Sequence, residues 1–276
     1  MLPNTFPVLD NPEIIESIFS KSNHLGVHIY PIGSISKNME GLELSEIALM
    51  YEKGVVAISD GVKCVQNPQL MRNALEYAKM FDIPIINHPE DFYLKNNGIV
   101  NESFFSTAKG LPAIPSIAES TIVYRDLEIA NFVGGKLHIP HVSTKESVEL
   151  IRRYKDRGVK VTAEVSPHHI GLSESDFTDY HSKFKITPPL RTKKDVSALI
   201  KGLKEGVIDC ISTDHFPHRV EDKDTDIITS ASGVIGLESA FSYTYNILSN
   251  QGFNIENITN EADVREILKG DHSNKS

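Results

Sequence analysis

The chain has 276 residues, of which 40% are hydrophobic, and a formal net charge of −9 at pH 7. It is long enough to bury a sizeable core, and its acidic balance without a Lys/Arg-rich run argues against nucleic acid or an anionic membrane as a partner. Two distant cysteines, Cys64 and Cys210, are typical of a reducing compartment. With neither a membrane-spanning run nor a signal-peptide pattern, we expect a cytoplasmic protein that acts on a small molecule.

Short runs rich in Val and Ile predict six strands that are buried on both faces. They lie at residues 27–32, 55–59, 83–87, 136–140, 159–164 and 208–213.

Helical periodicity lies between these strands. One helix is expected from Asn67, a good N-cap followed by proline, to Phe81, and a second from Thr144 to the neighbourhood of Gly158. Residues 195–203 and 237–248 repeat the pattern. Alternating strands and helices predict a parallel sheet, either doubly wound or closed as a barrel.

The fold class follows from the number of units and from a missing motif. A complete (β/α)₈ barrel has eight units and a doubly wound sheet five or six, but no strand here is followed by a GxGxxG or P-loop sequence. We therefore favour an α/β fold, namely a TIM-type (β/α)₈ barrel that is incomplete, with its first strands missing. We expect residues 1–270 to form this barrel domain and residues 271–276 to form a polar C-terminal tail.

Four of the predicted strands end on a carboxylate or an imidazole: Asp60, His88, His141 and Asp214. In a barrel the carboxyl ends of the strands surround one pocket, so these four side chains are candidate ligands of one or two divalent ions. A mixed shell of imidazole and carboxylate suits zinc. A single histidine of this kind is more often a hydrogen-bonded core or rim residue, and the coincidence of four strand ends favours the metal site.

Eight segments stand in an order that is highly specific. They are LPNTFP at residues 2–7, SDG at 59–61, HPED at 88–91, HVS at 141–143, EVSPHH at 164–169, PPLR at 188–191, TDHFPH at 213–218 and SGVIGLE at 232–238. Together they make the chain resemble a class I dihydroorotase of the cyclic amidohydrolase superfamily over nearly its whole length.

The resemblance implies reversible cyclisation of N-carbamoyl-L-aspartate to dihydroorotate in pyrimidine synthesis. Asp60 would bridge two zinc ions, His88 and His141 would hold the second ion, and Asp214 would ligate the first and shuttle the proton. The residues implied in substrate binding are Asn4, Thr187, His218, Ser232 and Gly233.

The chain also departs from the family pattern. The family's HxHxR segment, which carries two zinc ligands, lies upstream of the point where this sequence begins, and Asp60 stands alone where the family has two acidic residues. We therefore expect at most one tightly held zinc ion, with His88, His141 and Asp60 as its ligands. His24 and His28 are interpreted as structural or surface residues, and the pair at 168–169 as supporting other residues and not the metal.

Two other functions stay open. One is a non-catalytic dihydroorotase-like partner of aspartate carbamoyltransferase, and the other is a cyclic amidohydrolase of the hydantoinase or allantoinase type. Association into a homo-oligomer is also open. A hydantoinase or allantoinase is disfavoured because Asp60 stands where those enzymes place a carboxylated lysine, and Lys63 is out of register for that role.

Overall fold

A six-stranded parallel sheet organises the molecule. The computed structural model describes residues 1–22, 24–177 and 180–254. The strands of the sheet are β1 (Ile32–Gly33), β2 (Ala57–Ser59), β3 (Ile85–Ile86), β6 (Leu137–Ile139), β7 (Val161–Val165) and β8 (Cys210–Ile211). They pair in the order β1-β2-β3-β6-β7-β8, and every pairing is parallel.

This strand order distinguishes between the two expected folds. In a doubly wound sheet the strand order reverses at a switch point. Here each later strand of the sheet is added at the same edge, as in a barrel. Among the described residues no pairing joins β8 to β1, so the sheet stays open. The prediction of an incomplete (β/α) barrel is therefore confirmed, and the doubly wound alternative is wrong.

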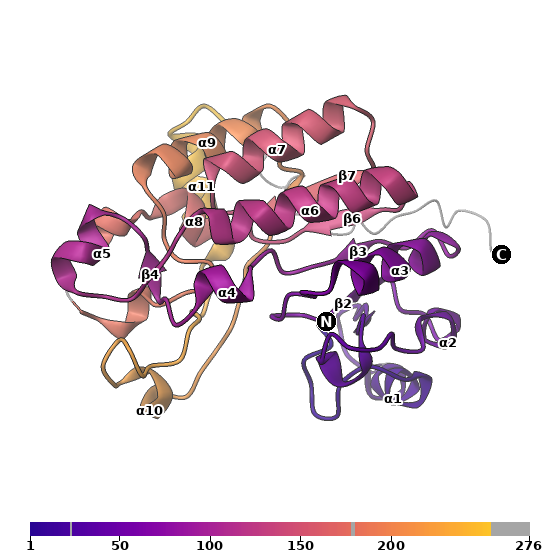
Figure 1. The fold of residues 1–276 in the computed structure, drawn as a ribbon. Coiled ribbons are helices and arrows are strands. Elements are labelled where there is room, and N and C mark those ends of the chain that lie inside the picture. The colour runs from indigo at the N-terminus through magenta and orange to yellow at the C-terminus, as the bar shows by residue number, and fades with distance from the viewer. Residues whose placement is uncertain (23, 178–179, 255–276) are drawn as a thin grey trace.

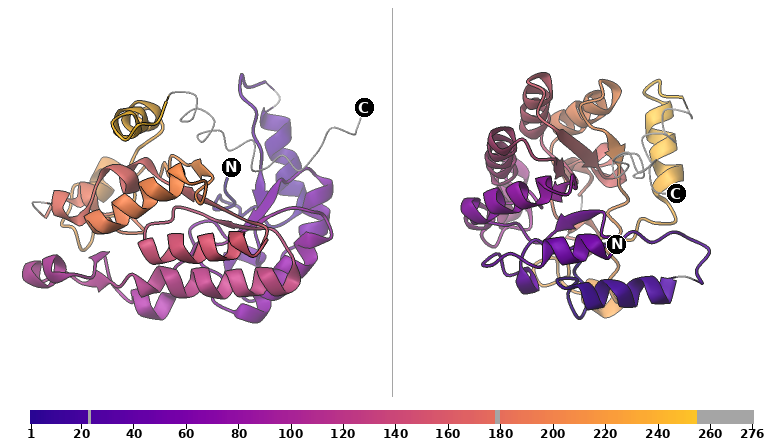
Figure 2. Two further views of the ribbon diagram at one scale, coloured as in Figure 1. Left: turned by 90° about the horizontal axis from the view of Figure 1, so that it is seen from above. Right: turned by 90° about the vertical axis from the view of Figure 1, so that its right-hand side faces the viewer.

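Four helices cover the outer face of this sheet: α3 (Pro68–Lys79), α6 (Ile117–Val133), α7 (Lys145–Asp156) and α9 (Lys193–Lys204). Figures 1 and 2 show α6, α7 and α9 side by side as one layer. Helix α3 begins as expected, because Asn67 Oδ1 accepts hydrogen bonds from the backbone N–H groups of residues 69 and 70. Its apolar face packs with the strands into one continuous core.

The sequence analysis missed helix α6. Its buried face carries Glu119 and Asp126, whereas Phe132 and Tyr124 are exposed on the outside. Because charged side chains interrupt the apolar stripe and aromatic ones lie opposite to it, the sequence shows no amphipathic period here. The two buried carboxylates hold loops that carry site residues, as described below.

The remaining elements are short. The helices are α1 (Pro12–Ser22), α2 (Ile47–Glu52), α4 (Phe92–Lys95), α5 (Phe104–Lys109), α8 (Pro167–Gly171), α10 (Val220–Lys223) and α11 (Ala240–Ser249). There are 3-10 turns at Lys37–Met39, Glu174–Asp176 and Ser182–Phe184, and a separate pair of strands, β4 (Val100–Asn101) and β5 (Ala113–Ile114).

The predicted strands are all present but shorter than expected. The largest difference is at residues 27–32, where the strand begins only at Ile32 and Val27 is exposed. The predicted barrel domain, residues 1–270, extends past the last described residue, and the predicted tail at 271–276 lies outside the described residues. In the described part of the chain, no helix has the length and apolar character needed to cross a membrane.

Candidate active site

The carboxyl ends of the strands open into one cavity of about 600 Å³. Seven of the nine predicted site residues line it: His88, His141, Thr187, Asp214, His218, Ser232 and Gly233. Asn4 and Asp60 do not. The tertiary structure thus brings together residues that follow three strands, β3, β6 and β8, with residues from the loops before and after β8.

A pair of histidines forms one wall of the cavity. His88 follows β3 and His141 follows β6, and the two strands are neighbours in the sheet. His88 Nδ1 and His141 Nε2 lie 2.9 Å apart. At this separation either one imidazole donates to the other, or both nitrogens direct their lone pairs at a single cation. His141 also has a φ of +37°, an uncommon backbone conformation for a residue with a side chain, which is more frequent at functional sites.

The other ring nitrogen of each histidine in this pair lacks a hydrogen bond. His141 Nδ1 and His88 Nε2 are buried without a hydrogen-bond partner, although Glu90 Oε1 lies 3.4 Å from His88 Nε2. Burial raises the pKa of Glu90, but its contacts with His88 and with Lys95, at 2.5 Å, outweigh this and lower the pKa to about 2. Glu90 is therefore ionised and placed to orient His88 from behind, as carboxylates do for metal-binding histidines.

Asp214 stands at the end of β8 in the same cavity, with a φ of +46°. Its Oδ2 lies 3.3 Å from His168 Nε2. Burial raises the pKa of the Asp214 carboxyl, but the contact with His168 and the neighbouring imidazoles of His141 and His169 outweigh it and lower the pKa to about 2. His168 was expected to support other residues, and here it contacts the predicted catalytic carboxylate.

His169 has a structural position. Its Nδ1 is 2.6 Å from Ser166 Oγ and its Nε2 is 3.0 Å from the carbonyl oxygen of Pro188, so both ring nitrogens have partners. Burial lowers its pKa well below the ordinary value, which keeps the ring neutral.

Asp60 is turned away from the cavity. Oδ1 accepts hydrogen bonds from the backbone N–H groups of Ile35 at 2.8 Å and Ser36 at 2.9 Å, and Oδ2 accepts one from Ser36 Oγ at 2.5 Å. Burial raises the pKa of this carboxyl, and these hydrogen bonds oppose the shift. The next residue, Gly61, lines the cavity instead. The structure therefore does not bring Asp60 together with the histidine pair.

The predicted substrate-binding loop is held firmly by its own contacts. Thr187 Oγ1 lies 2.9 Å from Ser232 Oγ, and His218 Nε2 lies 2.8 Å from the carbonyl oxygen of Ser232. The Gly233 N–H donates to the carbonyl oxygen of Lys185 and its own carbonyl accepts from Lys223 Nζ, both at 3.0 Å. Since these backbone groups are already engaged, the loop offers a substrate mainly its two hydroxyls and the His218 ring.

The cavity is also lined by Lys95, His138 and Glu164, to which the sequence analysis assigned no role. His138 Nε2 lies 3.3 Å from Glu164 Oε2, and its Nδ1 lies 2.8 Å from Thr162 Oγ1. The signal was present as strand alternation, because residues 162 and 164 are on the less buried face of β7, whereas its odd-numbered residues are buried. The sequence analysis interpreted the motif at residues 164–169 through its two histidines and therefore assigned no role to Glu164.

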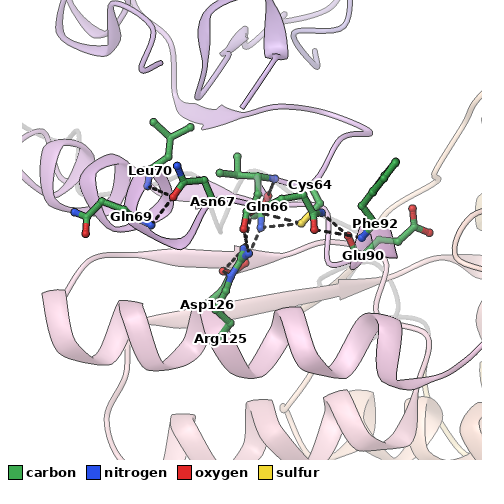
Figure 3. Close-up of polar contacts among 11 residues, drawn as sticks. Cys64, Gln66, Asn67, Gln69, Leu70, Glu90, Phe92, Arg125 and Asp126 are labelled. Carbon is green, nitrogen blue, oxygen red and sulfur yellow. Dashed lines mark hydrogen bonds and ion pairs between the residues drawn. The ribbon is translucent and has the colours of Figure 1, made fainter. Parts of the chain in front are cut away.

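The loop that carries Gly61 is fastened to α6, as Figure 3 shows. Arg125 donates to the carbonyl oxygens of Val65 at 2.8 Å and Gln66 at 3.0 Å, and pairs with Asp126. Asp126 in turn accepts a hydrogen bond at 2.6 Å from Asn87, the residue before His88. This buried network ties the ends of β2 and β3 to the same helix and fixes their spacing.

The donor set can be compared with what a metal ion requires. In the described part of the chain no group of three or more His, Cys, Asp or Glu side chains is already arranged as a metal site. The histidine pair, whose Nδ1 and Nε2 atoms converge at 2.9 Å, fits one divalent ion and supplies two of its ligands. A two-ion centre does not fit, because the carboxylate of Asp60, the expected bridging ligand, is engaged by Ile35 and Ser36 and does not line the cavity.

Comparisons with known proteins agree with this arrangement. The dihydro-orotase-like family matches residues 1–147. A dihydroorotase from Caldicellulosiruptor saccharolyticus is 48% identical over 93% of this chain, and one from Acetivibrio thermocellus is 46% identical over 91%. The chain spans about 60% of the length of these relatives.

Solved structures show the same fold at low sequence identity. An L-hydantoinase from Arthrobacter aurescens superposes with a TM-score of 0.81 at 21% identity, covering 97% of this chain and 62% of its own. A dihydroorotase from Saccharomyces cerevisiae, in complex with 5-fluoroorotic acid, gives 0.71 at 17% identity, covering 97% and 74%. With its family match, its sequence relatives and a pocket formed by barrel strand ends, the chain belongs to the dihydroorotase-like family.

Proposed function

We propose that this chain forms the pocket of a zinc-dependent dihydroorotase, which interconverts N-carbamoyl-L-aspartate and dihydroorotate. Family membership supports the reaction class. The observation that carries the proposal is the convergence of His88 Nδ1 and His141 Nε2 at 2.9 Å in a cavity that Asp214 also lines. Two imidazoles and a carboxylate around a substrate-sized cavity are the parts of a hydrolytic metal site.

The cofactor proposed is zinc, since imidazole nitrogen with carboxylate oxygen suits it. His88 and His141 would hold the ion. The family resemblance also predicts Asp60 as a ligand, which the hydrogen bonds of that carboxylate do not support. When bound, the ion supplies Lewis-acid polarisation of the amide carbonyl and makes water more acidic.

Asp214 is proposed as the acid and base. With a pKa of about 2 it is ionised at neutral pH, so it can take a proton from the attacking water in the hydrolytic direction. The same carboxyl then returns that proton to the ring nitrogen as the amide bond breaks. His168 Nε2, 3.3 Å from Oδ2, holds the carboxylate in position during both steps.

Substrate binding is assigned to Thr187, His218 and Ser232, which line the same cavity. The hydroxyls of Thr187 and Ser232 and the ring of His218 would contact the substrate ring and its carboxylate. Asn4 is proposed as a further contact, because its side chain lies beside Gly61 at the cavity rim, 3.6 Å from where a Cβ on that glycine would stand.

The test is ring opening by the zinc-saturated chain, followed through the loss of the ultraviolet absorbance of dihydroorotate. We expect turnover that D214N abolishes even at saturating zinc, since an amide cannot accept the proton. D224N, the same change at an exposed aspartate in α10's C-cap, is the control and should leave turnover intact.

The other outcomes discriminate among the alternatives. A zinc-saturated chain that binds dihydroorotate without turning it over supports the non-catalytic dihydroorotase-like partner of aspartate carbamoyltransferase. A preference for hydantoin or allantoin as substrate places the activity elsewhere in the superfamily. A chain that binds neither zinc nor dihydroorotate refutes the proposal. Homo-oligomerisation, association with the carbamoyltransferase and a cytoplasmic location stay predictions.

A further inference from the structure

We propose that Lys223 is a positioning residue for substrate binding, because its ammonium group joins the two chain segments, 182–187 and 231–233, that carry the hydroxyls of Thr187 and Ser232. Lys223 lies in α10 and does not line the cavity. The inference rests on the proposed function for its ligand, dihydroorotate. It adds a residue that holds the binding groups in place without touching the substrate.

The contacts of the Lys223 ammonium carry the first step. Nζ donates to the carbonyl oxygen of Ser182 at 2.9 Å on one segment, and to those of Ala231 at 2.9 Å and Gly233 at 3.0 Å on the other. The carbonyl oxygen of Lys185 lies farther away, at 3.5 Å. In return, the Ser182 hydroxyl donates to the carbonyl oxygen of Lys223. An ammonium has three N–H donors, so the three short hydrogen bonds use its whole capacity and tie the two segments together.

Both segments lead directly to the proposed substrate-binding groups. Ser232 lies between the two residues of its segment that Lys223 binds, so the ammonium holds the backbone before and after it. On the other segment, Thr187 follows Lys185, whose carbonyl oxygen accepts the Gly233 N–H at 3.0 Å. The two hydroxyls lie 2.9 Å apart. The spacing of the hydroxyls therefore depends on the link that Lys223 makes.

Gly233 also contacts the loop that carries Asp214. A Cβ built on Gly233 would stand 2.7 Å from the Phe216 ring and 2.8 Å from the Phe216 carbonyl oxygen, and the φ of Gly233 is +133°, so the position requires glycine. The Phe216 N–H donates to the carbonyl oxygen of Val234 at 2.9 Å. A shift of segment 231–233 on loss of the Lys223 ammonium would therefore reach this loop as well.

A neighbouring lysine does not duplicate this role. Lys185 lies on the segment that Lys223 holds, but its Nζ donates to the carbonyl oxygen of Ile228 at 2.8 Å. Burial lowers the pKa of the Lys223 ammonium, and the positive charge of Lys185 lowers it further. The three carbonyl oxygens offset this cost by replacing water around the charge, and they lose their shared donor if Lys223 is replaced by an apolar residue.

The experiment compares K223M with K183M in the full, zinc-saturated chain. Methionine keeps an unbranched apolar side chain but donates no hydrogen bond, and Lys183 is an exposed lysine in the segment that Lys223 holds. K223M should weaken dihydroorotate binding in calorimetry about tenfold or more, as expected when one hydrogen bond to a charged ligand is misplaced. Zinc affinity should change by less than about twofold, because His88 and His141 follow other strands. K183M should change neither affinity.

Chemical rescue separates placement by hydrogen bonds from loss of packing. In K223A, n-propylammonium replaces the deleted part of the side chain and should restore most of the affinity for dihydroorotate. Tetramethylammonium, a cation without N–H groups, should not restore it. If these variants do not fold, S182A, which removes only the hydroxyl that donates to the Lys223 carbonyl, should weaken dihydroorotate binding by about threefold.

Hydrogen exchange in the ligand-free chain tests the link without turnover. K223M should increase exchange in segments 182–187 and 231–233 together. Unchanged exchange in both segments, unchanged dihydroorotate affinity, an equal loss of zinc affinity, or rescue by tetramethylammonium would overturn the inference. A chain that binds dihydroorotate but never opens its ring contradicts only the proposed function. If the chain does not bind dihydroorotate, the proposed function fails, and exchange alone then supports or overturns the link made by Lys223.

Discussion

Glu119 is the buried residue on which the His141 loop depends, and replacing it with glutamine tests that dependence. Its carboxylate accepts hydrogen bonds from the backbone N–H and the hydroxyl of both Ser143 and Thr144, just after His141 and at the start of α7. Burial lowers the pKa of nearby Arg191, and the negative charge of Glu119 opposes that shift. One carboxylate thus satisfies four donors and balances a buried cation.

The magnitude follows from these contacts. Hydrogen bonds to a charged group contribute about 1.5–3 kcal/mol each, against about 1 kcal/mol for neutral pairs, so removing the charge from four donors costs about 2–8 kcal/mol. Because both hydroxyls can reorient toward a glutamine amide, we expect E119Q to lower the free energy of unfolding by about 3 kcal/mol. That is a large part of the 5–15 kcal/mol typical of a folded domain.

The assay is urea denaturation of the metal-free chain, with E149Q as the matched control. Glu149 is exposed on α7, so its replacement should change the free energy of unfolding by less than about 0.5 kcal/mol. E119Q should also weaken zinc binding, since the loop that orients His141 loses its anchor. A loss below about 1 kcal/mol, no different from the control, would refute the reasoning.

Further predictions concern acid stability, thiol reactivity, metal content and substrate binding. The pKa of Glu90 falls from 4.5 to about 2 on folding, so the ionised carboxylate stabilises the protein above pH 4.5 and this contribution is lost as the pH falls toward 2. In E90Q the free energy of unfolding, measured with urea, should therefore change less between pH 4.5 and pH 2. An unchanged pH dependence contradicts the shift. Burial raises the pKa of Cys64 to about 11, so iodoacetamide at pH 8 should label it only after unfolding; rapid labelling of the native chain would count against this. Elemental analysis after dialysis against zinc should give about one ion per chain or less, and two retained ions would disprove the single site at His88 and His141. H218A should weaken dihydroorotate binding in calorimetry while zinc affinity is unchanged, and loss of zinc would assign His218 to the metal instead.

Local patterns in the sequence determined the elements and their chemistry. Runs of Val and Ile located all six strands of the sheet, and the capping residues Asn67 and Thr144 located the starts of two covering helices. Reading the residues at the strand ends identified His88, His141 and Asp214 as members of one pocket. These results were accessible because period-two burial, helix caps and strand ends depend on neighbours close in the chain.

The tertiary structure decided which way each side chain faces. Asp60 and Gly61 are adjacent in sequence, yet only Gly61 lines the cavity, because donors 24 and 25 residues away draw the Asp60 carboxylate toward the loop after β1. Helix α6 was hidden because its buried carboxylates, Glu119 and Asp126, accept hydrogen bonds from residues on distant loops, which the sequence of the helix does not reveal. Hydrogen bonds between segments remote in the chain leave no local period in the sequence, so the sequence determined the candidates for the site and the fold selected among them.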